Sequence, residues 1–490
     1  MATLLGIVGL VNAWNLHGWP GRVNDDEGTY VDQAWAMVTH GEIAHYTYWY
    51  DHPFLGWALV AGYAWLTDGF DRVPSAVMVG REFMLVCVVA SAALLYVLAR
   101  RLGLHRVTAA VAVLAFGLSP LAVYLHRMVF LDNIAVVWML AALVFAASPR
   151  RSLAAAFGSA ACFAAATLSK ETIALLLPAV AWVLVQHGDR RTRRWSVGVF
   201  ATTYLTLVAA YPMFALLKNE LLPGPGHVSL GWAVYWQLVG RDGGGSLLAP
   251  ASATSSLVHS WLRVDAWLLI GGLLMAPVGL VVRRLRPVAF ALVLQVLVMC
   301  RGGYVPQPYA IAFLPFAALL VAGAADLLWR PVDRPWRERV PTWARAVLRR
   351  AGWPPLIAGA LACVVLVAPA WIGKLREQAT TDGSAASRAA TRWVLANVPR
   401  TAVVVVDDYV WLDLVRNDFA NTVWLFKLDS DPEVMRTILP DGYASIDYIV
   451  LPDQPHEILD SRPTLTQALQ HSHRVATFDG MNVRRVIAGP

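Results

Sequence analysis

Polar side chains that could do chemistry occur as short clusters in an otherwise apolar chain. The first cluster is the triplet Asp25-Asp26-Glu27, with Tyr30 close behind it. Adjacent carboxylates repel each other, which tends to raise the pKa of one of them and suits the group to accept a proton or to bind a divalent cation. The simpler alternative is a solvated acidic turn that caps the following helix.

Three further clusters each place a cation beside other polar groups. They are His126-Arg127 with Asp132, Lys170-Glu171, and Arg301 with Tyr304. Asp51-His52 closes the loop that begins with the acidic triplet. Each cluster also has a structural alternative: an Arg–Asp pair that seals a turn, an interfacial ion pair, a tight hairpin between helices, or a turn before an interfacial helix. The two glycines after Arg301 would equally let a ligand approach the backbone.

The composition argues against a water-soluble protein. Of 490 residues, 57% are hydrophobic and 15% are charged, and the mean hydropathy is +0.52, whereas soluble proteins have about 25% charged residues. The net charge of +7 could indicate nucleic-acid binding, but many of the arginines lie in five short segments: 100–106, 149–151, 188–194, 283–286 and 330–350. Basic clusters in short loops are an orientation signal of membrane proteins, so no nucleic-acid partner is expected.

Eleven apolar segments are predicted to cross the membrane as helices. A stretch of about 18 apolar residues spans the roughly 30 Å hydrocarbon layer, and shorter stretches are accepted where charges mark their ends. The segments are 2–19, 78–99, 107–125, 133–148, 152–168, 172–187, 195–217, 264–282, 287–300, 308–329 and 354–371. With the N-terminus in the cytoplasm, every Arg-rich segment lies on the cytoplasmic side, and loops 20–77 and 218–263 lie outside.

Two of the apolar segments admit another interpretation. Segment 2–19 has no Lys or Arg before Arg22 and could be a signal peptide cleaved near Ala13, although its apolar length suits a span. Segment 52–67 is apolar, but a span there would reverse the side of every later Arg cluster. Its Trp and Tyr residues therefore predict an interfacial helix.

The composition changes after the last apolar segment. From about residue 379, charged residues increase and short β-rich runs (VVVVD, VWLFK, IDYIVL) alternate with helix-like stretches such as Tyr409 to Phe419, which predicts a small α/β domain. We expect a membrane domain over 1–371 and an extracytoplasmic domain over 372–490, which could dock the acceptor. The four cysteines all lie in apolar runs and predict neither a disulfide framework nor a metal site.

The predicted topology brings all four polar clusters to the external face. Carboxylates together with Arg127, Lys170 and Arg301 at one membrane surface would form an anion-binding site with a base nearby. Transfer of a group from a lipid phosphate fits these requirements, because the phosphate needs cations and the attacking hydroxyl needs a carboxylate to take its proton.

These motifs resemble those of the GT-C glycosyltransferases that use polyprenyl-phosphate sugars, in the branch of protein O-mannosyltransferases and the lipid A aminoarabinose transferase. The family's acidic-acidic-x-x-Tyr pattern is similar to Asp26 to Tyr30, its His-Pro-Pro-Leu pattern to His52 to Leu55, its Arg-x-x-x-x-Asp pattern to Arg127 to Asp132, and its lysine before the sixth span to Lys170. The resemblance covers about residues 1–330, and the tail resembles that of actinobacterial members.

The resemblance implies roles for most of these residues. Asp26 would be the general base, with Glu27 and Asp132 as further catalytic carboxylates, Asp132 orienting donor or acceptor. Lys170 and Arg301 would hold the donor phosphate, with Tyr30 and Tyr304 hydrogen-bonding in the same region. Beyond the resemblance, further candidates are Arg127 and His52 for the phosphate and Asp51, His227 and Trp232 for the substrates. Thr29 stands where some relatives carry Arg, and Asp51-His52 where the lipid A enzyme has Glu-Lys, so the sugar stays open.

The second outer loop adds aromatic residues to the substrate site. Trp232 and Trp236 lie in a loop rich in Pro and Gly, where exposed indole faces suit sugar stacking and the loop could cover the acceptor. Anchoring at the membrane interface is the alternative.

The expected reaction is a single inverting displacement at the anomeric carbon, on the outer side of a bacterial cell membrane. Partners would be a polyprenyl-phosphate sugar, membrane lipids and a hydroxyl acceptor that could be a glycan, lipid, protein or small molecule. No cofactor is required, although Asp25, Asp26 and Glu27 could bind a divalent ion. Competing hypotheses are a transporter or flippase of a lipid-linked or anionic substrate, and an oligosaccharyltransferase that modifies asparagine.

Overall fold

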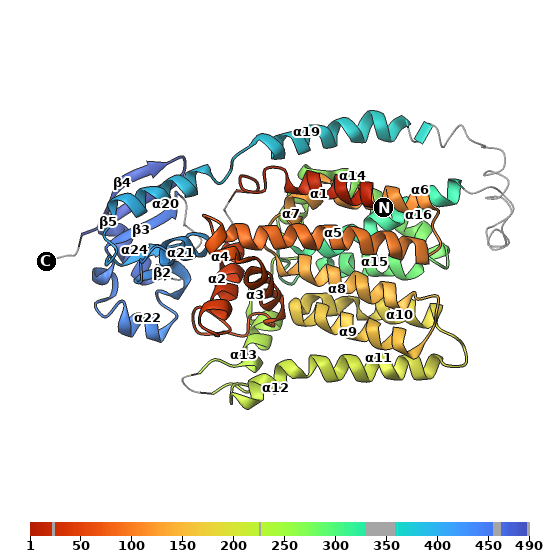
Figure 1. The fold of residues 1–490 in the computed structure, drawn as a ribbon, viewed down its shortest axis with the longest axis horizontal. Coiled ribbons are helices and arrows are strands. Elements are labelled where there is room, and N and C mark those ends of the chain that lie inside the picture. The colour runs from red at the N-terminus through yellow and green to blue at the C-terminus, as the bar shows by residue number, and fades with distance from the viewer. Residues whose placement is uncertain (22–24, 225–226, 330–357, 360, 454–461, 488–490) are drawn as a thin grey trace.

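The computed structural model describes residues 1–21, 25–224, 227–329, 358–359, 361–453 and 462–487. Helices make up most of it, and its sheet lies in the C-terminal part (Figure 1). The apolar bundle consists of α1 (Ala2–Ala13), α5 (Val77–Arg101), α6 (Arg106–Leu118), α7 (Pro120–His126), α8 (Leu131–Ala146), α9 (Leu153–Ser169), η1 (Glu171–Leu176), α10 (Leu177–His187), α11 (Arg193–Val208), α12 (Ala210–Leu217), α14 (Ala253–Val281), α15 (Arg286–Cys300) and α16 (Tyr309–Trp329).

Ten of the eleven predicted spans coincide with these helices. Among the described residues, four helices are long and apolar enough to cross a membrane, namely Val77–Arg101, Arg193–Leu217, Ala253–Val281 and Tyr309–Leu327, and the bent pair α6–α7 could be a fifth span. The other apolar helices are shorter, so the number of spans stays a prediction. Of the eleventh segment, residues 354–357 and 360 lie outside the described residues. Residues 358–359 and 361–371 are described and helical, through η4 (Cys363–Val367) and the start of α19 (Ala368–Thr380).

Two predicted boundaries differ from the structure. The first helix ends at Ala13 instead of residue 19, and α14 begins at Ala253, eleven residues before the predicted span at 264. Asp265 leaves the helical region (φ −150°, ψ 93°), so α14 bends where the apolar segment begins. The length of the apolar stretch predicted the part of α14 that follows the bend at Asp265. It did not predict the helical turns that precede the bend.

The break between α6 and α7 has a local cause. Ser119 takes an extended conformation and its hydroxyl accepts a hydrogen bond from the Ala122 amide, while Pro120 occupies the first helical position. Proline has no N–H to continue the preceding helix but fits the start of a new one. The two helices therefore meet at 59°.

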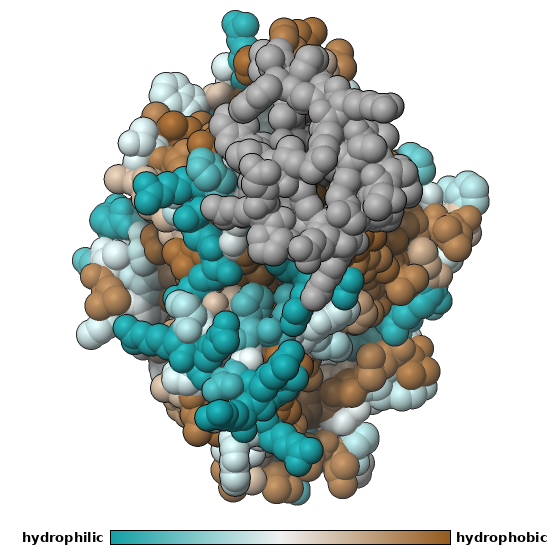
Figure 2. Space-filling model, turned by 90° about the vertical axis from the view of Figure 1, so that its right-hand side faces the viewer, coloured by the Kyte–Doolittle hydropathy of each residue, from teal (hydrophilic) through white to brown (hydrophobic). Residues whose placement is uncertain are grey.

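Several Arg-rich loops meet at the end of the bundle that lies opposite the sheet (Figure 1). Arg100, Arg101 and Arg151 line one cavity there together with Met1, and Arg284 donates a hydrogen bond to the Gly103 carbonyl at 2.7 Å. Figure 2 shows this end, with hydrophilic side chains beside hydrophobic ones. Their gathering at one end is what the topology prediction requires, although the orientation in the membrane stays a prediction.

The first outer loop folds into helices between the bundle and the sheet. They are α2 (Asp25–Thr39), α3 (Leu55–Thr67) and α4 (Gly69–Arg72), and α13 (Leu230–Tyr235) with the π-helical turn η2 (Trp236–Gly240) belongs to the second loop. The predicted helix over 52–67 is therefore present as α3. Trp65 and Leu66 at its end are 73% and 75% exposed, which suits an interfacial position.

The tail forms a five-stranded mixed sheet with the order β2-β1-β3-β5-β4. Its elements are α20 (Ala385–Asn397), β1 (Val404–Val406), α21 (Asp408–Val415), β2 (Thr422–Trp424), η5 (Leu425–Lys427), α22 (Pro432–Thr437), η6 (Gly442–Ser445), β3 (Tyr448–Pro452), α24 (Pro463–Gln470), β4 (Ser472–Phe478) and β5 (Met481–Val486). β1 pairs in parallel with β2 and β3, whereas β5 is antiparallel to β3 and β4. All three predicted strands are present, although the second ends at Trp424 and the predicted helix at Tyr409 stops at Val415.

The tail packs directly on α2. A Cβ atom added to Gly28 would lie 2.2 Å from the backbone of Asp408 and Tyr409, the start of α21. Asp413 accepts a hydrogen bond from the Ala76 amide at 2.7 Å, and one buried apolar cluster includes residues of α2, α3, α5, α20, α21 and the sheet. The division at 371/372 falls inside α19, which runs along the bundle towards the sheet (Figure 1).

Gly28→Ala is predicted to destabilise the contact between α2 and α21. The added methyl group must displace backbone, which costs about 1–3 kcal/mol in a packed core, so the unfolding midpoint in detergent should fall. Gly62→Ala in α3 is the matched control, since no atom lies within 4 Å of its added Cβ and alanine favours a helix by about 0.5–1 kcal/mol. Equal midpoints for both variants would contradict this packing.

Candidate active site

Asp26 lies in the first turn of α2, close to several charged groups. Its side chain is accessible to water, yet enough protein surrounds it that desolvation raises its pKa above the ordinary 3.8. Lys170 and His52 oppose this shift, Asp51 adds to it, and Arg241 opposes it. A carboxylate with a raised pKa that stays accessible to water is suited to accept a proton.

Lys170, His52 and Glu171 form a row of hydrogen bonds. The Lys170 ammonium is 2.8 Å from His52 Nε2, and His52 Nδ1 is 3.0 Å from Glu171 Oε2. Lys170 is only 5% exposed. Because an ammonium can only donate, Nε2 must accept, which leaves the imidazole proton on Nδ1, facing Glu171.

Protonation of His52 would rearrange this row. Burial is the largest single influence on the pKa of His52 and lowers it, but the charge and hydrogen bond of Glu171 together with the charge of Asp51 leave the pKa above 6.5. A second proton on Nε2 removes the acceptor that Lys170 uses. The ammonium is then released to bind an anion, while His52 keeps its bond to Glu171.

Two tyrosines fix the backbone at His52. The Tyr48 and Tyr211 hydroxyls both reach the His52 carbonyl, at 2.5 and 3.3 Å, and lie 2.8 Å from each other. Tyr50 has a positive φ of 59° and its hydroxyl bonds to Glu220. These contacts connect the end of the first outer loop to α12 and the segment after it.

Asp132 and Tyr30 complete the group. Asp132 lies in the first turn of α8, is 4% exposed, and interacts electrostatically with Lys170, His52 and Glu171. The Tyr30 ring stacks on Trp57 with centroids 6.3 Å apart and lies 6.1 Å from the His52 ring. The structure thus brings together six of the predicted site residues: Asp26, Tyr30, Asp51, His52, Asp132 and Lys170.

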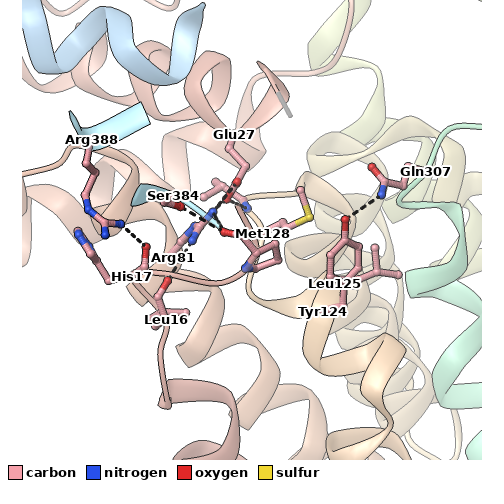
Figure 3. Close-up of polar contacts among 12 residues, drawn as sticks. Leu16, His17, Glu27, Arg81, Tyr124, Leu125, Met128, Gln307, Ser384 and Arg388 are labelled. Atoms are coloured by element: carbon pink, nitrogen blue, oxygen red, sulfur yellow. Dashed lines mark hydrogen bonds and ion pairs between the residues drawn. The ribbon is translucent and has the colours of Figure 1, made fainter. Parts of the chain in front are cut away.

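Glu27 lies in a different environment from Asp26. Its carboxylate accepts hydrogen bonds from Arg81 at 3.0 and 2.8 Å and from the Val129 amide at 3.1 Å (Figure 3). Arg81 also donates to the carbonyls of Leu16 and Pro20, and the ion-paired side chains are at most 1% exposed. This geometry favours a structural role for Glu27 over the expected catalytic one.

The two predicted phosphate-binding arginines have other contacts. Arg127 is buried, donates to the Val11 carbonyl at 2.7 Å and lies near Arg81. Arg301 is exposed after the end of α15, and its guanidinium lies next to Gly303. Both phosphate-binding assignments therefore stay predictions.

Arg241 brings a cation towards Asp26 from the second outer loop. Its guanidinium lies 3.5 Å from the centre of the Tyr304 ring and acts electrostatically on Asp26. Tyr304 therefore contacts Arg241, which in turn acts on Asp26. Arg241 lies in the Pro- and Gly-rich second outer loop, and no local sequence pattern distinguishes it from Arg301.

His227 and Trp232 line a separate cavity of about 740 Å³ between the first outer loop, the second outer loop and the tail. It also includes Trp49, Asp431 and Arg436. His227 and Trp232, both predicted to bind substrate, therefore lie together in the wall of this separate cavity.

One group of described residues has the ligand atoms to hold a metal ion. Asp32, His45 and Asp408 each offer an atom, all within 4.8 Å of one another. His45 Nε2 is 3.1 Å from Asp408 Oδ1 and 3.9 Å from Asp32 Oδ2. Two carboxylates and an imidazole suit Zn²⁺ and similar ions. The group links α2 to α21, whereas the expected ligand Glu27 pairs with Arg81.

Comparisons with known proteins point to one fold. Residues 51–215 match the family model described as dolichyl-phosphate-mannose-protein mannosyltransferase. The chain is similar to ArnT from Cupriavidus metallidurans bound to undecaprenyl phosphate, with 16% identity, TM-score 0.58, and coverage of 100% of this chain and 99% of that one. No curated protein sequence matches the chain significantly.

A second set of similar structures is the archaeal oligosaccharyltransferase AglB from Archaeoglobus fulgidus. Its complex with an inhibitory peptide and dolichol-phosphate has 11% identity and a TM-score of 0.55, covering 92% of this chain and 69% of that one. A complex of the same enzyme with Zn and sulfate gives 15% identity and a TM-score of 0.55, covering 92% and 68%. At these identities the similarity concerns the fold.

Glu27→Gln is predicted to destabilise the protein strongly. It leaves Arg81 buried without a countercharge, which costs about 3–5 kcal/mol, so the unfolding midpoint in detergent should fall sharply. Glu82→Gln is the control, because its partner Arg72 is 45% exposed and exposed ion pairs contribute little to stability. A Glu27→Gln protein of normal stability without activity would instead assign Glu27 to the chemistry.

Proposed function

We propose that this chain, which has the fold of the GT-C glycosyltransferases, transfers a sugar from a polyprenyl phosphate to a hydroxyl acceptor with inversion. The observation that carries the proposal is an accessible carboxylate, Asp26, on which Lys170, His52 and Arg241 act electrostatically, next to the hydrogen-bonded row of Lys170, His52 and Glu171. The match of residues 51–215 to a mannosyltransferase model supports glycosyl transfer. A transporter is not favoured, since the similar structures reported above are glycosyltransferases.

The proposed reaction is a single displacement. The acceptor hydroxyl oxygen attacks the anomeric carbon, a new C–O bond forms, and the bond from that carbon to the phosphate oxygen breaks. Its electron pair leaves with the polyprenyl phosphate. Asp26 takes the hydroxyl proton as the oxygen attacks. The products are the glycosylated acceptor and the lipid phosphate.

Lys170 and Arg241 would stabilise the departing phosphate. Negative charge grows on the phosphate as the bond breaks, and cations fixed beforehand in a protein environment stabilise it without reorganising. His52 would control Lys170, because its protonation releases the ammonium from the imidazole. Glu171 keeps the ring oriented. Asp132 would orient a substrate hydroxyl near Lys170 and His52.

The donor is proposed to be a polyprenyl-phosphate sugar in the outer leaflet of a bacterial cell membrane. Apolar helices beside the site would hold the lipid tail. The ArnT structure contains undecaprenyl phosphate and one AglB structure dolichol-phosphate, which supports a lipid phosphate as the carrier here. The transferred group is a hexosyl or pentosyl residue.

Asp26→Asn is predicted to abolish transfer while the donor still binds. General-base catalysis contributes about 10²–10⁴-fold, so transfer from a radiolabelled polyprenyl-phosphate sugar should fall by at least about 100-fold. Asp68→Asn is the control, because Asp68 is exposed in the same outer loop and asparagine tolerates its left-handed φ of 52°. Undiminished transfer by Asp26→Asn would remove the assigned base.

The pH dependence of transfer should move in opposite directions when charges near Asp26 are removed. Only the deprotonated base is active, so kcat/KM rises with pH through the pKa of Asp26, which desolvation holds above 3.8. The negative charge of Asp51 raises this pKa, and Arg241 lowers it. Asp51→Asn should therefore move the acid limb to lower pH and Arg241→Gln to higher pH. Shifts in the same direction would contradict the assignment.

Transfer is expected to proceed without a divalent metal ion. A phosphate is already a good leaving group, and Lys170 and Arg241 supply positive charge where it is needed. Assays in EDTA should therefore retain full transfer. Loss of transfer that Zn²⁺ or Mn²⁺ restores would instead indicate a role for Asp32, His45 and Asp408.

A further inference from the structure

The cavity that contains Trp232 is formed by three segments far apart in the sequence. Its wall includes Thr47 and Trp49 from the first outer loop, residues 223–224 and 227–229 with Trp232 from the second, and residues 430–433 with Arg436 from the tail. Its volume, about 740 Å³, lies within the range of roughly 300–1,000 Å³ typical of small-molecule sites.

Aromatic faces dominate one side of this cavity. The rings of Trp49 and Trp232 are 6.5 Å apart at 68°, and Trp232 also stacks on Trp236 at 5.6 Å and 9°. Trp232 is 43% exposed. The stack holds its ring in a fixed orientation, so an open apolar face is available to the C–H groups of a ligand.

The cavity wall also carries hydrogen-bonding groups of mixed charge. Glu433 and Arg436 are exposed on α22, and Ser430 precedes it. Asp431 is buried and its carboxylate caps α22 by accepting a hydrogen bond from the Glu433 amide at 3.0 Å. Donors and acceptors beside flat aromatic faces suit a ligand with many hydroxyls, and the mixed charge favours a neutral one.

Amides at one edge of the sheet already have hydrogen-bond partners. β2 is one of the two edge strands; its Thr422 amide donates to the Phe419 carbonyl at 3.3 Å, and its Trp424 amide donates to the Tyr46 hydroxyl at 3.1 Å. Peptides that add to a sheet need such amides. This arrangement favours a carbohydrate over an extended peptide.

Lys427 connects the cavity to the active site. It is 8% exposed, and its ammonium lies 5.2 Å from the centre of the Trp49 ring. It interacts electrostatically with Asp431 on the cavity wall and with Asp51. Asp51 in turn acts on Asp26. A ligand that stacks on Trp49 would therefore lie two residues along the chain from Asp51, which acts electrostatically on the proposed base.

From these observations, and resting on the proposed function, we infer that this cavity binds the acceptor and that the acceptor is a neutral oligosaccharide. The tail would thus supply half of the acceptor site. Trp49 and Trp232 would stack on sugar rings, while Glu433 and Arg436 would bind their hydroxyls.

The inference is tested by binding, without turnover. The full chain carrying Asp26→Asn is titrated in detergent by calorimetry with mannotriose, maltotriose, galactotriose and arabinotriose, and with an uncharged Ser/Thr peptide. At least one sugar should bind, Trp232→Ala should weaken it about tenfold or more, and Trp232→Phe should retain most of the affinity. Trp65→Ala, which removes a 73% exposed indole from α3, should change nothing.

The outcomes separate this inference from the proposed function. The acceptor assignment would be overturned if no oligosaccharide binds, if only the peptide binds, or if Trp232→Ala does not weaken sugar binding. This holds even if wild-type protein transfers sugar from a lipid phosphate to another acceptor. Conversely, sugar could bind in a way that depends on Trp232 while wild-type protein transfers nothing from any lipid-linked sugar. That result would support the carbohydrate site and contradict the proposed function.

Discussion

Three consecutive residues of α2 point in three directions, and the position of this helical turn determines the rest of the site. Successive residues of an α-helix are about 100° apart, so Asp26, Glu27 and Gly28 face different neighbours. Asp26 faces the cations, Glu27 enters the core to pair with Arg81, and Gly28 touches the backbone of the tail. The ion pair and the close backbone contact hold the helix on two sides and thereby position the carboxylate on the third.

The same turn of α2 also joins the helical bundle to the C-terminal tail. Asp408 begins α21 where Gly28 leaves room for it, and lies 3.1 Å from His45 of the first outer loop. Lys427 and the cavity wall follow in the same part of the tail. An acceptor bound between loops and tail would therefore be positioned relative to α2, which carries the base. The contact between α2 and α21 belongs to one buried apolar cluster, which would fix the tail relative to the base.

Much of the fold could be predicted from hydropathy, because apolar length and basic loops report directly on membrane helices. Strands such as β1, whose three residues are all buried, are visible as unbroken valine runs. Sequence alone could identify Asp26, His52 and Lys170, because charged groups at a membrane surface are energetically costly and therefore indicate a functional site. Glu27 could not be told apart from Asp26, since only the rotation of α2 separates them. Nor could Arg241 be preferred over Arg301, because the path of a glycine-rich loop decides which guanidinium approaches the base.

The central claim is that Asp26, Lys170 and His52 share one site with the phosphate of a lipid donor. A cryo-electron microscopy structure with a bound polyprenyl-phosphate sugar analogue tests it most directly. The account predicts phosphate oxygens within hydrogen-bond distance of the Lys170 ammonium, with the anomeric carbon facing Asp26. A phosphate bound instead at Arg127 or Arg301, with Lys170 still paired to His52, would contradict it.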